Sequence, residues 1–382
     1  MTLIQALSRG PRHHFFGYYG IAPCDRAMRY HLALETDFHD RLPSATDKAA
    51  VGLIDIPAGE FLPYAHTSAF NFQQGTMFHW IDVGQGEEFT FNDWESDRLV
   101  ARAVHPDTRA VRTLGAAIEA VSPVEPIALG LHYARMSRCR PVVGYADPRP
   151  PRDPVSYPED DGLFLVDLES GESYLVLSIA DVIRALPAEE TLAGPAYFNH
   201  VEFSTDGRRL LFFCRIQKPG GGFYSSLWTV NPDGSGLACQ IDYQHKVSHF
   251  AWRDGRRLLI STDVLGRGMQ FVEFTDGAGD FRPFGEGVLP GDGHATFSPD
   301  RRWIACDTRP EEPDRLSELL LYDVARGTKV SLGRFHQPEP FSGDIRCDLH
   351  PRWSADGSAV SFDSVHEGSR QIYMADVFDV VA

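Results

Sequence analysis

The sequence has no cysteine pair at CxxC spacing and no stretch near the roughly 20 apolar residues that a membrane span needs. Its six cysteines are scattered, and several lie inside apolar runs such as LLFFCRI and WIACD. Such cysteines are typical of buried free thiols in a reducing compartment. The first residues, MTLIQALSRGPRHHFF, lack the apolar core of a signal peptide. These absences predict a soluble, cytoplasmic protein without disulfides or membrane helices.

Positive charge is also scarce. Lys and Arg number 36 against 53 Asp and Glu, which gives a formal net charge of −17. An acidic surface field repels polyanions such as duplex nucleic acid and anionic membranes. We therefore expect neither nucleic acid nor a membrane as a partner. The 43% hydrophobic and 12% aromatic content is enough for a globular core and excludes a disordered chain.

Four segments of the second half share one pattern. Each begins with a histidine, has an aromatic residue three positions later and ends in a turn with an aspartate: HVEFSTDG, HFAWRDG, HATFSPDR and HPRWSADG. A second apolar run follows each of them, which indicates a β-hairpin. The four histidines recur every 45 to 56 residues: His200, His249, His294 and His350. Repeats of this length, each a short antiparallel sheet, are typical of propeller blades.

The first half shows the same rhythm more loosely. The segments FFGYYGIAPCDRAMRYHLALET, FNFQQGTMFHWIDVGQGEEFTFND and PIALGLHYARMSRCRPVVGYAD each resemble a hairpin. The sequence therefore predicts an all-β chain folded as a single seven-bladed β-propeller of four-stranded antiparallel blades. Residues 146–161 are expected to form a Pro-rich loop, and residues 178–192 a short helix or irregular insertion. The approximate blade bounds are 15–65, 66–117, 122–178, 197–243, 247–284, 292–333 and 347–382.

The repeat pattern also predicts where polar side chains gather. In a propeller the first strand of each blade lines the central channel, and its start lies at the same mouth as the end of the second strand. The four repeat histidines stand at first-strand starts, and Arg215 stands at a second-strand end. The early blades offer Gln74, Asn92 and Tyr145 at comparable positions. A channel mouth is the default ligand site, although any one histidine can instead serve as a hydrogen-bonding partner between blades.

A metal is one way to satisfy several imidazoles that converge on one channel. His249, His294 and His350 belong to consecutive blades, and Asp292, Cys347 and Asp348 lie near them in the sequence. Imidazole with carboxylate suits Mn, Fe or Zn, whereas imidazole with thiolate favours Zn. We therefore expect a divalent metal, Mn or Zn, with these ligands: His249, His294, Asp348 and His350.

At these residues the chain resembles the TolB-like propellers and, more narrowly, the oligogalacturonate lyases and ulvan-lyase-type polysaccharide lyases. The motifs GDGHATFSPD, DLHPRWSADG and SVHEGSRQIYMADV carry the resemblance, over about residues 198–380. In oligogalacturonate lyases, histidines like His294 and His350 bind manganese together with a glutamine and a histidine two residues before the latter. This chain has Asp348 at that histidine position, and the glutamine would fall near Ile345.

The resemblance implies β-elimination on an oligosaccharide or polysaccharide that contains a uronate. That reaction needs a cation to neutralise the carboxylate, a base for the α-proton and an acid for the leaving oxygen. The candidates are Arg215 or the metal for the carboxylate, His200 or His249 as the base, and Tyr145 as the proton donor. The residues expected to contact the sugar or its carboxylate are Gln74, Asn92, Arg138 and Arg346.

Two other functions stay open at this point, because a fold does not fix a function. One is a glycoside hydrolase, which needs two carboxylates about 5–10 Å apart; the candidates are Glu35, Asp93, Asp263, Asp307 and Asp363. The other is a non-catalytic, TolB-type propeller that binds a ligand or a protein. An anionic substrate also needs a basic patch within the acidic field, for which the sequence offers Arg135, Arg138, Arg140, Arg215, Arg309 and Arg346.

Overall fold

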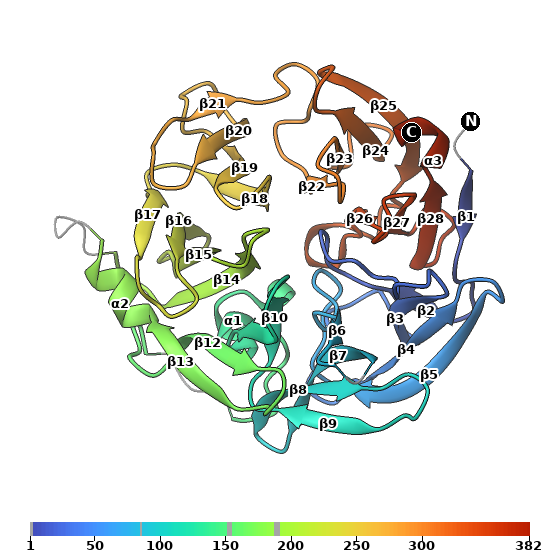
Figure 1. Ribbon diagram of the computed structural model, residues 1–382, viewed down its shortest axis with the longest axis horizontal. Coiled ribbons are helices and arrows are strands. Elements are labelled where there is room, and N and C mark those ends of the chain that lie inside the picture. The colour runs from blue at the N-terminus through green and yellow to red at the C-terminus, as the bar shows by residue number, and fades with distance from the viewer. Residues whose placement is uncertain (1–2, 85, 151–154, 187–191) are drawn as a thin grey trace.

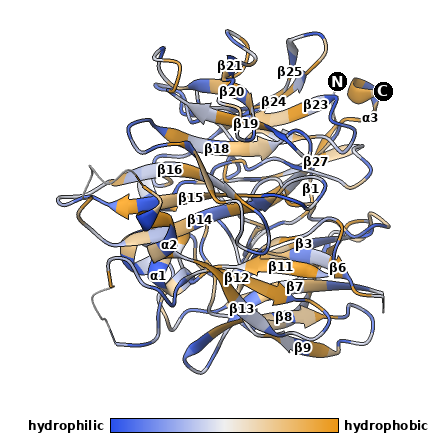
Figure 2. Ribbon diagram, turned by 60° about the vertical axis from the view of Figure 1, so that its left-hand side comes forward, coloured by the Kyte–Doolittle hydropathy of each residue, from blue (hydrophilic) through white to orange (hydrophobic). Residues whose placement is uncertain are grey.

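The computed structural model describes residues 3–84, 86–150, 155–186 and 192–382. Its strands form seven sheets, each with four antiparallel strands. The sheets stand around a central channel as the blades of a ring (Figure 1). Hydrophobic residues concentrate along the strands of the blades, whereas many of the connecting loops are hydrophilic (Figure 2). The predicted seven-bladed β-propeller is confirmed.

Blades 1 to 3 are built from consecutive strands. Blade 1 comprises β2 (His13–Phe15), β3 (Tyr30–Thr36), β4 (Ala49–Asp55) and β5 (Glu60–Thr67). Blade 2 comprises β6 (His79–Asp82), β7 (Glu87–Glu95), β8 (Arg98–Val104) and β9 (Val111–Leu114). Blade 3 comprises β10 (Ile118–Val121), β11 (Ile127–Gly130), β12 (Gly162–Asp167) and β13 (Ser173–Ser178).

Blades 4 to 6 follow the same rule. Blade 4 comprises β14 (Ala196–Phe203), β15 (Leu210–Gln217), β16 (Phe223–Val230) and β17 (Ala238–Ile241). Blade 5 comprises β18 (Val247–Trp252), β19 (Arg257–Thr262), β20 (Gln270–Thr275) and β21 (Arg282–Pro283). Blade 6 comprises β22 (Thr296–Phe297), β23 (Trp303–Asp307), β24 (Leu316–Asp323) and β25 (Thr328–His336).

Blade 7 joins the two ends of the chain. Its strands β26 (Arg352–Trp353), β27 (Ala359–Ser364) and β28 (Gln371–Asp376) are completed by β1 (Ile4–Ala6). Strand β1 pairs antiparallel with β28, so that Ile4 lies opposite Ala375. The ring is therefore closed by backbone hydrogen bonds, and the outer edge of β28 is covered. The short helices η2 (Gly343–Ile345) and α3 (Phe378–Val381) flank this blade.

The repeated Ser-x-Asp turns explain the regular sequence repeat in the second half of the chain. In blade 4 the Ser204 hydroxyl donates to Asp206 at 2.7 Å and accepts from the backbone N–H of Arg209 at 3.0 Å. The same pair of bonds occurs at Ser298 and Ser354. The aspartates are thus turn formers, as is typical of short polar side chains in turns. The aromatic residues of the repeat are core residues: Phe203, Trp252, Phe297 and Trp353.

Blade 3 departs from the prediction. The segment PIALGLHYARMSRCRPVVGYAD is not a hairpin, because after β11 it forms α1 (Tyr133–Cys139) and η1 (Pro141–Val143). Tyr133, Met136 and Cys139 are buried, and their spacing of three residues fits one face of a helix rather than a strand. The channel strand of this blade is β10, which precedes the predicted blade bound of residue 122.

The predictions of a short helix after blade 3 and of free cysteine thiols are confirmed for the residues that the structure describes. The segment that follows β13 contains α2 (Ile179–Arg184), which begins with a capping box between Ser178 and Asp181. Parts of the two predicted insertions, 151–154 and 187–191, lie outside the described residues. All six cysteines are free thiols, and Cys239 is the exposed one. Among the described residues, the helices are too short or too polar to cross a bilayer.

Candidate functional site

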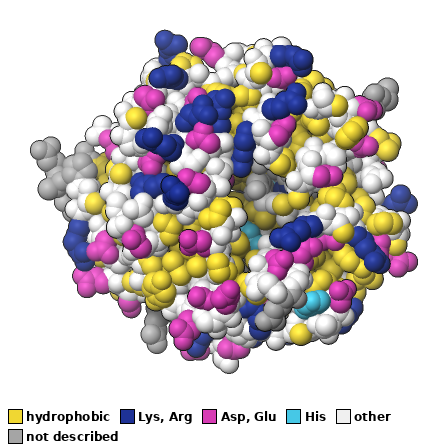
Figure 3. Space-filling view, viewed as in Figure 1, with side chains coloured by type: hydrophobic (Ala, Val, Ile, Leu, Met, Phe, Trp, Pro, Cys, Tyr) yellow, Lys and Arg dark blue, Asp and Glu magenta, His cyan; other side chains and the backbone are white. Residues whose placement is uncertain are grey.

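The four repeat histidines form a row in the channel, in the order of their blades. The ring centroids of His200 and His249 are 6.4 Å apart, those of His249 and His294 are 4.0 Å apart, and those of His294 and His350 are 4.1 Å apart. Side chains from blades 4 to 7 therefore meet at the centre of the ring. We call these four residues the imidazole row. The space-filling view shows the ring hollowed at its centre (Figure 3).

Irregular backbone turns these histidines toward the channel. The register of β14 shifts between Asn199 and Glu202, and that of β18 shifts between Val247 and Phe250, so His200 and His249 both lie in bulges. A bulge redirects a side chain that a regular strand would place elsewhere. His200 and His350 also have positive φ angles of 54° and 49°. Non-glycine residues adopt this region at an energetic cost, and such residues cluster at functional sites.

Two tyrosines of the segment after β2 lie against the imidazole row. The Tyr18 Oη is 2.6 Å from His200 Nδ1. The Tyr19 ring lies 5.1 Å from the His294 ring, centroid to centroid. Burial raises the pKa of Tyr18 well above its ordinary value, so its phenol stays protonated at neutral pH. Tyr18 could not be predicted from the sequence, because its partner His200 is 182 residues away and no local pattern indicates the contact.

A buried carboxylate, Asp307, holds the imidazole of His294 and the backbone of His294 and His350. Both Asp307 carboxylate oxygens lie 2.9 Å from His294 Nδ1, and they also accept the backbone N–H groups of His294 and His350. This bond fixes the His294 tautomer and leaves its Nε2 with a free lone pair. The Nε2 atoms of His294 and His350 face each other at 3.1 Å. Burial lowers the pKa of both imidazoles well below the ordinary value, so both are neutral.

Asp348 completes a group that is suited to a metal. One ligand atom each from His294, Asp348 and His350 lies within 4.8 Å of the others, and all three residues are buried. Two ligands at ~2.1 Å from an ion are ~3.0 Å apart at right angles and ~3.4 Å apart in a tetrahedron. The 3.1 Å between the two Nε2 atoms matches this geometry. The donor set of two imidazoles and a carboxylate suits Mn or Zn.

Arginines compete for the same carboxylate. Asp348 Oδ2 lies 2.7 Å from Arg309 Nη1 and 2.8 Å from Arg346 Nε. Burial alone would raise the pKa of Asp348, but Arg309 and Arg346 outweigh it and hold the pKa well below the ordinary value. The expected ligand His249 lies outside this group of three residues, and its Nδ1 is paired at 2.8 Å with Asp292 Oδ1. The structure thus joins three of the four predicted ligands.

Two arginines near the row, the buried Arg215 and the half-buried Arg140, lack a carboxylate partner. Arg215 is 4% exposed, and its Nη1 has no hydrogen-bond partner. The guanidinium carbons of Arg215 and Arg140 lie 4.7 and 4.9 Å from the centroid of the Phe223 ring. Among the described residues, no carboxylate forms an ion pair with either. Burial, with a further contribution from Arg140, lowers the pKa of Arg215 to about 10.

Further buried polar groups are left without partners. Both side-chain polar atoms of Gln74 and of Asn199 are unpaired, as is the Tyr197 hydroxyl. Tyr197 lies directly opposite Arg215 in the pairing of β14 with β15. Buried polar atoms are rarely left unpaired in folded proteins, so each such group needs a partner such as water or a ligand. Of the residues predicted to contact a sugar, Gln74 is the one with unpaired side-chain atoms.

Two predicted site residues serve the framework instead. The Asn92 amide donates to the Ile118 carbonyl oxygen at 2.8 Å and to Tyr145 Oη at 3.1 Å, and its oxygen accepts the Ile118 N–H at 2.7 Å. Asn92 therefore ties blade 2 to blade 3 and has no N–H left for a sugar. Tyr145 is fully buried and stacked on Tyr133, with ring centroids 4.2 Å apart. Among the described contacts, none joins Tyr145 to the imidazole row or to Arg215.

The remaining candidates are also engaged. Arg138 is paired with Asp147, and Arg135 donates to the carbonyl oxygens of Ala196, Val155 and Ser156. The predicted basic patch is thereby reduced to Arg140 and Arg215. Each carboxylate considered for glycoside hydrolysis has partners of its own: Glu35 with His14, Asp93 with Thr67 and Arg102, Asp263 with the Lys246 N–H, Asp307 with His294, and Asp363 with Arg352.

Fold and site together define a class: a seven-bladed β-propeller with a histidine- and arginine-rich channel. No protein-family model and no curated protein sequence matches the chain. Solved structures do match. An oligogalacturonate lyase from Vibrio parahaemolyticus superposes with a TM-score of 0.67 at 14% identity, over 99% of this chain and 96% of that chain. An oligogalacturonate lyase in complex with manganese gives 0.64 at 14% identity, over 98% and 92%.

The likeness extends to part of a peptidase as well. A puromycin-hydrolyzing peptidase from Mycobacterium tuberculosis gives a TM-score of 0.54 at 11% identity, over 91% of this chain but only 50% of that chain. Identities this low show the shared fold alone. The resemblance to oligogalacturonate lyases that the motifs suggested is thus confirmed at the level of the fold, which these lyases share over nearly their whole length.

Proposed function

We propose that the protein cleaves a uronate-containing glycan by β-elimination at the channel site. One observation carries the proposal: Arg215 is a buried cation with no carboxylate partner, near His200, whose pKa burial lowers well below the ordinary value. A buried charge without a partner is unfavourable, and a substrate carboxylate would supply the missing countercharge in a bidentate pair. The full-length likeness to oligogalacturonate lyases adds support.

His249 is the proposed base. Its Nδ1 lies 2.8 Å from Asp292 Oδ1, which orients the ring and leaves Nε2 free to accept a proton. Burial alone would raise the pKa of Asp292, but His249 and Arg309 hold it well below the ordinary value. Asp292 therefore stays ionised and stabilises the imidazolium that forms when His249 takes the α-proton. Asp292 is a positioning residue and does not touch the substrate.

The pair of Tyr18 and His200 is the proposed proton donor, in place of Tyr145. The α-proton moves to His249, and the bond between the β-carbon and the leaving oxygen breaks. A double bond forms between the α-carbon and the β-carbon. The leaving oxygen then needs a proton. Tyr18 keeps its phenolic proton and contacts His200 Nδ1 at 2.6 Å, so the pair can deliver one and be reprotonated.

His294, His350 and Asp348 are the residues that would hold a divalent metal. Such an ion, when bound, supplies positive charge beside the carboxylate as the enolate develops. The chain's own contribution is the orientation of His294 by Asp307 and the neutrality of both imidazoles. These are the properties that a metal ligand requires.

The test is the ultraviolet absorbance of unsaturated uronate, measured on oligogalacturonate, ulvan and glycosaminoglycan oligosaccharides with added Mn²⁺. We expect activity on one of these classes and a loss of about 10²–10⁴ in kcat/KM for His249→Ala. The matched control is His245→Ala, because His245 is on the same chain segment but is half-exposed and pairs with Asp263 rather than with Asp292. Absence of the absorbance on all three classes refutes the proposal, and release of reducing ends without absorbance indicates glycoside hydrolysis instead.

A further inference from the structure

A cavity of about 400 Å³ lies on the other side of Tyr18 and Tyr19 from the imidazole row. Its wall includes Val121 and Phe203, where the channel strands β10 and β14 end. His294 and His350 of the row instead precede the channel strands β22 and β26. Both tyrosines line this cavity and also contact the row. The cavity therefore lies where the channel strands end, and Tyr18 is the residue that its wall shares with the proposed catalytic groups.

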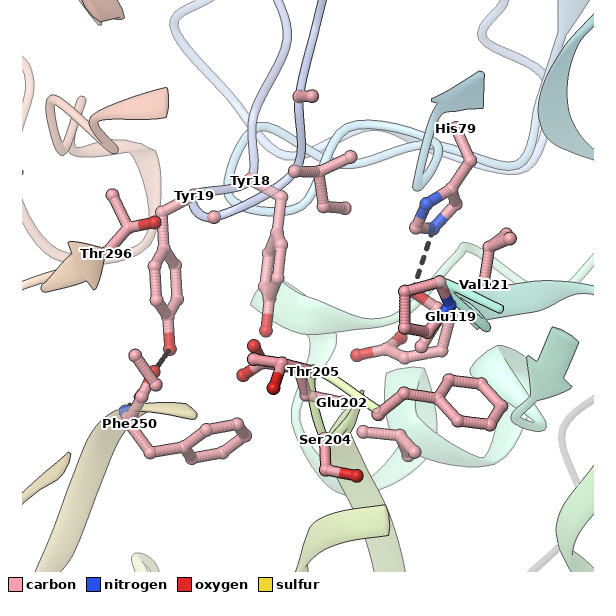
Figure 4. Close-up of a pocket in the computed structure, with 18 of the residues that line it drawn as sticks. Tyr18, Tyr19, His79, Glu119, Val121, Glu202, Ser204, Thr205, Phe250 and Thr296 are labelled. Atoms are coloured by element: carbon pink, nitrogen blue, oxygen red, sulfur yellow. Dashed lines mark hydrogen bonds between the residues drawn. The ribbon is translucent and has the colours of Figure 1, made fainter. Parts of the chain in front are cut away.

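Two acidic side chains face this cavity. Glu119 and Glu202 come from the neighbouring channel strands β10 and β14, and both lie close enough to Tyr18 to raise the pKa of its phenol. Figure 4 shows Tyr18 and Tyr19 extending into the cavity, with Glu119 and Glu202 beyond the Tyr18 hydroxyl. We call this space the Glu119–Glu202 cavity.

One oxygen of Glu119 has no partner. Glu119 is 1% exposed; its Oε2 accepts a hydrogen bond from the Tyr133 hydroxyl, but its Oε1 accepts none. Leaving a buried carboxylate oxygen unpaired is unfavourable, so a donor from a ligand is the expected remedy. Burial raises the pKa of Glu119 and of Glu202 to about 8 each, although backbone N–H groups near both, and Arg301 near Glu202, partly offset the effect of burial.

The remaining charged and titratable groups of the cavity offset the burial of the two glutamates only in part, through Arg301. His79 is neutral, because burial lowers its pKa to about 4, and its Nε2 is bonded to the Glu119 carbonyl oxygen at 3.0 Å. Arg301 is the one arginine or lysine among the described lining residues, and it is exposed at the rim near Glu202. Tyr18 and Tyr19 both keep their protons, since burial raises their pKa values above the ordinary one.

The rest of the wall suits a ligand with an apolar body. Trp80, Phe203 and Phe250 present aromatic surface, and Val121 and Val201 present aliphatic surface. Aromatic faces attract a cation, and two carboxyl groups accept its N–H donors. We propose that the Glu119–Glu202 cavity is a second ligand site, and that it binds an organic ammonium ion with an apolar substituent.

The experiment uses benzylammonium as the probe and benzyl alcohol as its neutral analogue. Isothermal titration calorimetry of the whole protein at pH 8 should detect benzylammonium and give at least tenfold weaker binding of the alcohol. Glu119→Gln and Glu202→Gln keep the shape but remove the charge, and each should weaken benzylammonium binding at least tenfold. The matched control is Glu318→Gln, because Glu318 is buried but paired with Lys329 away from the cavity.

Three outcomes overturn the proposal: no binding of benzylammonium, equal binding of the alcohol, or undiminished binding in both glutamine variants. Circular dichroism and thermal unfolding check that each variant is folded, and a fall in affinity in either folded variant supports the site. The result does not depend on lyase activity, because neither glutamate is among the proposed catalytic groups.

Discussion

Replacing Arg215 with methionine should raise the stability of the protein while removing its binding of a substrate carboxylate. A fall in the pKa of this buried guanidinium from 12.5 to about 10 corresponds to about 3 kcal/mol of destabilisation of the charged form. Methionine keeps an unbranched, apolar side chain against Phe213 and Phe223 and removes the charge. The variant also loses two cation–π contacts, of about 0.5–1 kcal/mol each, and a 3.3 Å bond to Ser225. The net expectation for Arg215→Met is a gain of about 1 kcal/mol.

The measurement is equilibrium unfolding in urea, with the midpoint and slope compared between the two proteins. The second arm adds a carboxylate sugar, galacturonate. It should raise the midpoint of the parent protein and leave that of Arg215→Met unchanged, because a ligand stabilises only the state that binds it. A loss of stability of more than 1 kcal/mol in Arg215→Met would show that the charge is well paired in the fold, and the reasoning behind the proposed function would fail.

Three more predictions follow from the same contacts. Asp307→Asn should weaken the binding of Mn²⁺ about 10–100-fold in calorimetry, because it disturbs the orientation of His294; equal affinity would contradict the metal-binding group. Asn92→Ala should lower the free energy of unfolding by about 2–3 kcal/mol, because it leaves buried groups of Ile118 unpaired; in the folded variant KM should be unchanged, whereas a sugar contact at Asn92 would raise it. Benzylammonium binding should tighten as pH rises from 6 to 8, because Glu119 and Glu202 are neutral well below their raised pKa values of about 8 and anionic above them; pH-independent affinity would contradict a role for these acids.

The blades of the second half could be predicted because their signals are local. The Ser-x-Asp turn, the aromatic residue before it and the apolar run after it all lie within one hairpin. Blade 3 was predicted wrongly in part because α1 replaces a strand-like run whose only helical signal is the spacing of Tyr133, Met136 and Cys139. Where a helix and a strand are both compatible with a short apolar run, packing decides between them.

The part of the site that the sequence could predict is the group of histidines, because the repeat places one at the equivalent position of each successive blade. Equivalent positions of successive blades lie at the same distance from the central axis. The four histidines therefore meet: His200, His249, His294 and His350. The roles within the row were not predictable. His249 pairs with Asp292 rather than joining His294, Asp348 and His350, and Asn92 and Tyr145 bond to each other. These outcomes depend on hydrogen bonds between distant segments, which no spacing in the sequence reveals.

The shared sheet of blade 7 has a consequence for synthesis of the chain. Strand β1 is made first, yet its partner β28 ends at Asp376, so the two meet only when nearly the whole polypeptide is available. Blades 1 to 6 can assemble in order before β28 is made, and the backbone groups of β1 stay unpaired until then. Blade 7 can therefore be completed only after β28 has been made, and a chain that stops short of β28 leaves β1 without its pairing partner.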